Sequence, residues 1–125
     1  MSDEKSKLSK VKHDSNMLYI LLKDLDREKI KKYSSYMTMP NIQGILEDEE
    51  LMKTADAFFE NSLNISLTSK KIYMHRNTLV YRIEKIHKAI GLDIRKFEDA
   101  MAFKIVAILN ELTENDTEKS IDCSF

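Results

Sequence analysis

The 125-residue sequence contains little of what β-rich, disulfide-linked or membrane-spanning proteins require. It has two glycines, one proline and no tryptophan, whereas an all-β fold needs turn residues at short intervals. Its single cysteine excludes a disulfide within one chain and is typical of a reduced compartment. The longest apolar run, 17–22, is too short for a bilayer, and the charged N-terminus lacks the apolar core of a signal peptide. We therefore expect one cytoplasmic, mainly helical domain.

A net charge of −1 also excludes a uniformly basic protein. The charge is nevertheless unevenly distributed along the chain. Residues 61–96 contain eight lysines and arginines against two acids, a local charge of +6, whereas 41–60 and 97–125 each carry −5. A basic middle segment between two acidic flanks is compatible with a surface that binds a polyanion.

Hydrophobic spacing predicts an all-α fold, a helical bundle of roughly five to six helices that contains a helix-turn-helix motif. Residues 1–14 are expected to be a flexible N-terminal segment, and 15–40 an N-terminal helical segment. Within the latter, the run 17–22 predicts a short buried helix. Asp26 can cap a second helix, of which one face would consist of Ile30, Tyr33 and Met37.

Residues 44–112 are expected to form the helix-turn-helix domain, after a connector or single turn at 42–46. A helix should open among the acids at 47–50, which suit the positive end of a helix dipole. Its expected inner stripe is Leu51, Met52, Ala55, Phe58, Phe59, Ser62 and Leu63.

After a polar break at 61–67, Thr68 can cap a short helix over 69–73, with Met74 and His75 in the turn that follows. The next helix, about 76–90, places Leu79, Ile83, Ile86 and Ile90 within one narrow arc and ends at Gly91.

The last helix, about 97–112, is apolar nearly all round, so we expect it to be central to the core or shared with a second chain. The remaining residues, 113–125, are expected to be a flexible C-terminal tail.

A short helix, a tight turn and a longer amphipathic helix predict a helix-turn-helix, whose second helix enters the major groove. If Leu79 lies at the centre of the buried face, Thr78, Tyr81, Lys85 and Lys88 point to the opposite side, with Asn77 and Arg82 at its flanks. Asn77 can contact adenine and Arg82 guanine or phosphate, while the lysines suit phosphates. The predicted DNA-binding residues are Thr68, Lys70, Lys71, His75, Arg76, Asn77, Thr78, Tyr81, Arg82, Lys85 and Lys88.

These residues also have structural interpretations that the sequence leaves open. A basic amphipathic helix is usually a solvated face. Asn77 and Thr78 can serve only to cap the helix, and His75 can serve only to fix the turn. Arg82 can pair with Glu49 or Asp48 instead of DNA.

From about Thr68 to Leu92 the chain resembles the C-terminal helix-turn-helix of PucR-type regulators, which include purine-catabolism and sugar diacid (CdaR-type) activators. A weaker resemblance covers 48–110. Ser69 stands where the family prefers alanine. The matching positions are Thr68, Ile72, His75, Arg76, Asn77, Thr78, Tyr81, Arg82, Ile83, Gly91, Leu92 and Asp93.

The resemblance implies a bacterial transcriptional regulator that binds double-stranded DNA through the helix starting near Arg76, as a homodimer on paired half-sites. Family members carry long N-terminal ligand-sensing regions, and 15–40 resembles at most the tail of one. A small-molecule effector is therefore expected only through a missing or separate sensing region. We expect no enzyme activity, no cofactor, no metal and no membrane partner. The alternative is a helical protein-interaction module that retains the motif as a scaffold.

Overall fold

The computed structural model describes residues 17–123, with side chains described over 17–114. The predicted flexible segment 1–14 lies outside this part. Between residues 17 and 123 the chain forms seven helices and no strand, which confirms the all-α class. The helices are α2 Met17–Lys23, α3 Arg27–Tyr36, α4 Ile42–Leu46, α5 Glu49–Glu60, α6 Ile65–Lys71, α7 Arg76–Ile90 and α8 Phe97–Cys123. One more helix is present than predicted, because 42–46 forms α4 rather than a connector.

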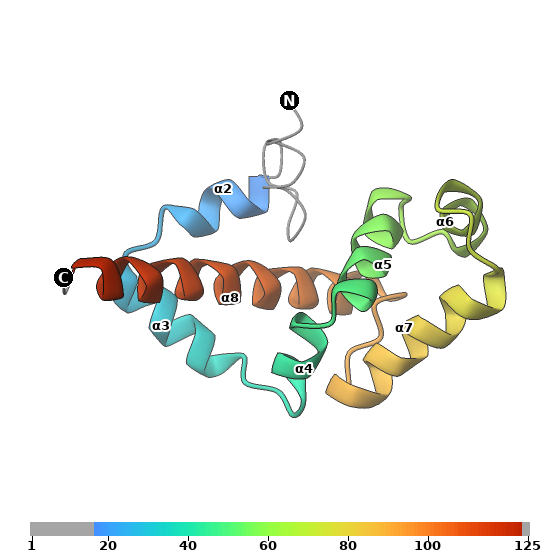
Figure 1. The fold of residues 1–125 in the computed structure, drawn as a ribbon. Coiled ribbons are helices and arrows are strands. Elements are labelled where there is room, and N and C mark those ends of the chain that lie inside the picture. The colour runs from blue at the N-terminus through green and yellow to red at the C-terminus, as the bar shows by residue number, and fades with distance from the viewer. Residues whose placement is uncertain (1–16, 124–125) are drawn as a thin grey trace.

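The long helix α8 joins two groups of helices (Figure 1). Helices α4 to α7 gather near its N-terminal end, where α5 packs on α4, α6 and α7. Helices α2 and α3 pack against the rest of α8. No helix in the described part is long and apolar enough to cross a bilayer.

The main core lies where α4, α5, α7 and the start of α8 meet. It consists of Ile45, Leu51, Ala55, Phe58, Leu79, Ile83, Ile86, Ile90, Ile94, Ala100 and Phe103. All four aliphatic residues predicted for the inner face of 76–90 are among them. Each large side chain in this core contributes about 1.5–3 kcal/mol by leaving water, which fixes the rotation of α7 about its own axis.

Helices α3, α5 and α7 have capping residues at one of their ends. Asp26 caps α3 by accepting the Lys29 N–H at 2.9 Å, and Asp48 caps α5 by accepting the Leu51 N–H at 3.1 Å. Gly91 follows α7 with φ of 82°, a left-handed conformation that costs glycine little. The predicted cap at Asp26, the predicted start of a helix among the acids at 47–50 and the predicted end at Gly91 are confirmed.

Three local predictions are wrong. The run 17–22 is helical but contains no buried residue, because α2 packs mainly on α8 and the remainder of its surface stays open. Ser62, predicted for the inner stripe of the helix before it, is exposed. Finally, α8 continues to Cys123, since the polar residues after Leu112 include no glycine or proline to stop it.

Candidate nucleic-acid interface

Helices α6 and α7 pack against each other and form the predicted helix-turn-helix. The first helix begins at Ile65, because the Asn64 side chain accepts the Leu67 N–H at 2.8 Å and caps it. The turn at 72–75 contains Tyr73 with φ of 53°. A non-glycine residue in this left-handed conformation makes the chain reverse sharply before α7.

His75 positions the start of α7. Its backbone is extended, and its imidazole Nδ1 accepts the Asn77 N–H at 3.0 Å. This bond satisfies one of the free N–H groups at the helix start and leaves the Nε2–H as the donor. His75 therefore fixes the turn while its exposed ring remains at the same surface as Asn77.

The outward face of α7 is the one that its hydrophobic spacing predicts. Five of the predicted DNA-binding residues are exposed there, opposite the buried aliphatic stripe. They are Asn77, Thr78, Tyr81, Lys85 and Lys88. A shallow depression of about 350 Å³ lies along this face, lined by Tyr81, Glu84, Lys85, Lys88 and Ala89.

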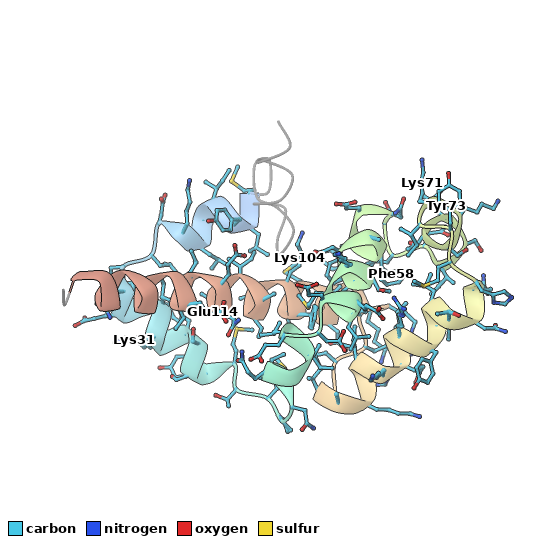
Figure 2. The ribbon with its side chains drawn as sticks, viewed as in Figure 1. Lys31, Phe58, Lys71, Tyr73, Lys104 and Glu114 are labelled. Carbon is cyan, nitrogen blue, oxygen red and sulfur yellow. The ribbon has the colours of Figure 1, made fainter. Side chains whose placement is uncertain are left out.

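The end of α6 adds further exposed polar groups. Lys70 and Lys71 occupy its last turn and both are exposed. Figure 2 shows Lys71 and Tyr73 projecting outward beyond α6, and Tyr73 is 95% exposed. The sequence prediction omitted Tyr73. Its only signal was an aromatic residue in a turn, out of phase with its apolar neighbours Ile72 and Met74.

Thr68 does not belong to this surface. Its side chain is fully buried, and its hydroxyl donates to the Asn64 carbonyl at 2.7 Å. Because Asn64 caps α6, Thr68 lies inside the helix and not at its cap. The prediction that Thr68 caps the helix is wrong, and its burial removes it from any direct contact with DNA.

Both arginines of the motif interact with neighbouring helices. The exposed Arg76 donates from Nη1 to the Ser66 hydroxyl of α6 at 2.9 Å. Arg82 donates from Nη1 to Thr54 Oγ1 at 3.1 Å and from Nη2 to Glu50 Oε2 at 3.2 Å, both on α5. The sequence suggested Glu49 or Asp48 as alternative partners for Arg82; the structure places Glu50 there.

Arg95, the third arginine of the basic segment 61–96, lies in the loop after α7. Arg95 contacts both carboxylate oxygens of Asp93, at 2.7 and 3.1 Å, and also forms an ion pair with Glu84 of α7. The Arg95 hydrogen bond holds the pKa of Asp93 below its ordinary value, and these same carboxylates raise the pKa of Arg95. Glu84, which lines the depression on the outward face of α7, is thereby ion-paired, and it shares the single charge of Arg95 with Asp93.

These pairings divide the basic segment into two classes. Arg82 and Arg95 are paired with carboxylates, whereas five cations near the turn and along α7 form no ion pair with another described residue. They are Lys70, Lys71, Arg76, Lys85 and Lys88. We call these five, together with Tyr73, His75, Asn77, Thr78 and Tyr81, the α6–α7 outer surface.

Comparison with known proteins agrees with this geometry. Residues 51–108 match the PucR C-terminal helix-turn-helix domain. The chain is 30% identical over 92 residues to the purine catabolism regulatory protein of Bacillus subtilis, covering 74% of this chain and 17% of that protein. It is 36% identical over 61 residues to the carbohydrate diacid regulator of Escherichia coli, covering 49% of this chain and 16% of that protein.

The uncharacterized protein YxkF of Bacillus subtilis is 40% identical over 67 residues, which cover 54% of this chain and 23% of that protein. The chain thus spans less than a quarter of the length of these relatives. No solved structure matches it significantly. The match over 51–108 covers α5 to α7 and the start of α8, the same elements that build the motif and its core. Residues 51–108 of this chain therefore form a helix-turn-helix domain of the PucR C-terminal type.

Proposed function

We propose that this protein is a sequence-specific DNA-binding transcriptional regulator that reads the major groove with α7. One observation carries the proposal: the α6–α7 outer surface gathers five cations without carboxylate partners among the described residues. Unpaired lysines and arginines can neutralise phosphates without first breaking an ion pair. The domain match and the similarity to two proteins named as regulators support the same conclusion.

Within this surface the residues divide by position on α7. Asn77 and Thr78 lie in the first helical turn, where a recognition helix meets base edges, and both are exposed. Lys85 and Lys88 lie two to three turns later, where the helix leaves the groove and phosphates are nearest. We propose that Asn77 contributes to sequence preference and the two lysines to affinity.

Selection of bound sequences from random duplex DNA, followed by titration of the selected site, tests this function. The logarithm of the association constant should fall linearly with the logarithm of salt concentration, because each phosphate contact contributes about −0.9 to the slope. Asn77→Ala should change the preferred base at one position. The matched variant Lys88→Ala should weaken all sequences alike and make the slope shallower by about 1. Binding that ignores salt, or no binding by the wild type, would exclude the proposal.

We further propose a homodimer in the bacterial cytoplasm, because helix-turn-helix proteins read paired half-sites related by the two-fold axis of the dimer. Selected sites should then show two inverted half-sites about 10–10.5 base pairs apart from centre to centre, or a multiple of that spacing. Sedimentation of the complex should give two chains per duplex. One chain on an asymmetric site would contradict the dimer but not the DNA binding.

The alternative function is a protein-interaction module. It is favoured by exposed apolar side chains at the start of α8, Phe97 at 67% and Met101 at 42%, beside an apolar groove of about 420 Å³. Affinity capture from untreated and nuclease-treated lysates separates the two functions. Enrichment of specific DNA supports the regulator, whereas a protein partner retained after nuclease treatment, without DNA enrichment, supports the module. We propose that the regulator has no catalytic role. We also propose that any small-molecule effector acts through a separate sensing region.

A further inference from the structure

Arg82 differs from the other basic residues of α7 in how it is held. Its side chain is 24% exposed, and both terminal nitrogens are engaged by α5. Thr54 and Glu50 are four residues apart on α5, so they present their oxygens on one face of that helix. The planar guanidinium spans both oxygens at once. Arg82 thus bridges two helices by a pair of hydrogen bonds.

The direction of these bonds is settled by Thr54. This residue is only 2% exposed, and its hydroxyl donates to the Glu50 carbonyl at 2.8 Å. Its proton is therefore committed within α5, and toward any other group its oxygen can only accept a hydrogen bond. A guanidinium, which only donates, is the matching partner. Thr54 is thus a buried acceptor that faces Arg82.

Moving Arg82 to the DNA would break both bonds and leave the Thr54 oxygen without its donor in a buried position. Lys85 and Lys88 face no such cost, because no described side chain engages them. A hydrogen bond from Arg82 to a base edge would therefore add little binding free energy beyond that of the two bonds it breaks. A contact from Lys85 or Lys88 breaks no such bond, so its whole free energy contributes to binding.

We infer that Arg82 is a positioning residue, which fixes the recognition helix α7 against α5 through Thr54 and Glu50 and does not itself read a base. The inference rests on the proposed DNA-binding function. Thr54 and Glu50, which lie outside the helix-turn-helix itself, then help to determine how well α7 fits the groove. DNA affinity depends on them without any contact between them and DNA.

The test uses variants of both partners on the full chain with the selected DNA site. Thr54→Val is nearly isosteric and removes the acceptor while leaving Arg82 intact. It should weaken the selected site about five- to tenfold, the range expected when one ordinary hydrogen bond is lost. The preferred base at every position and the salt slope should stay as in the wild type. Thr54→Ser, which keeps the hydroxyl, should restore affinity to within about twofold.

Arg82→Ala should likewise weaken the selected site without changing the preferred bases or the salt slope. The double variant should bind no more weakly than Arg82→Ala alone, because Arg82→Ala has already removed the bond to Thr54. Lys88→Ala is the matched control on the same helix and should lower the salt slope by about 1. The inference is overturned if Arg82→Ala relaxes preference at one base position or lowers the salt slope while Thr54→Val has no effect.

Unfolding measurements separate this inference from the proposed function. If the wild type fails to bind DNA, the proposed function is lost. A double-mutant cycle of Arg82→Ala and Thr54→Val in urea denaturation still decides whether Arg82 couples α5 to α7. Measurable coupling supports the positioning role, and additive effects of the two substitutions refute it.

Discussion

The two ends of α8 are built differently, although one continuous helix joins them (Figure 1). At its start, Phe103 is fully buried and completes the core with α5 and α7. Further along, α8 is covered by α2 and α3, of which α2 contains no buried residue and α3 contains only Ile30. Yet α2 contains the longest apolar run of the chain, 17–22. Burial thus depends on how many helices surround a segment, and not on how apolar the segment is.

The two ends also differ in their polar groups. Around α6 and α7, cations point outward, and Glu84 of α7 is ion-paired with Arg95. On the α2 side, Tyr19 is partly buried near Glu111, and burial, with the charge of Glu111, raises the pKa of its phenol. The end of the molecule with α6 and α7 therefore presents a positively charged surface. The end with α2 instead has ionisable groups where two helices touch. The difference suggests that the first end carries recognition.

Core truncation should give the largest contrast between the two ends. Phe58, which Figure 2 places at α5, is fully buried, and Phe58→Ala should lower the free energy of unfolding by about 3–5 kcal/mol. Leu21 of α2 is 60% exposed, and Leu21→Ala should cost less than about 0.5 kcal/mol. Urea denaturation measures both. Equal losses would mean that α2 is as well anchored as α5.

Helix caps should give a smaller contrast. Asp48→Ala should cost about 1–2 kcal/mol, because α5 is anchored in the core and the loss of its cap affects global unfolding. Asp26→Ala should cost about 0.5 kcal/mol, because the first turn of α3 is exposed and can open locally. Amide hydrogen exchange should then show faster exchange confined to the start of α3. A global loss of protection in Asp26→Ala would contradict this.

The smallest effect should be the pH dependence due to Asp93. Its folded pKa lies below the ordinary 3.8, so its stabilising contribution is complete above that value and is lost as pH falls through the lowered folded pKa. Asp93→Asn should cost less than about 1 kcal/mol near neutral pH, because Arg95 is partly exposed. Thermal unfolding from pH 7 to 2 should show wild type and variant converging in acid. A constant difference across this range would rule out Asp93 as the source.

The sequence predicted the helix-turn-helix half of the fold better than the rest. The aliphatic spacing of 76–90, the acids at 47–50 where a helix begins and Gly91 each act within a few residues, and each prediction was confirmed. The predicted burial of 17–22 was wrong because burial depends on what packs alongside that segment. The predicted end of α8 was wrong because no glycine or proline stops the helix after Leu112. For the candidate site, local spacing predicted the exposed face of α7 but missed Tyr73, whose exposure follows from the turn.

The sequence by itself determined which side of α7 faces outward, since the phase of Leu79 against Tyr81 is a property of any α-helix. It also determined the uneven charge that concentrates cations in 61–96. Only the tertiary structure decided the roles of Thr68 and Arg82. Thr68 is buried by its helix and its neighbours, and Arg82 is bound by Thr54 and Glu50, which lie 28 and 32 residues earlier in the chain. Periodicity describes a residue relative to its own helix, whereas its hydrogen-bond partner depends on which other helix the fold brings beside it.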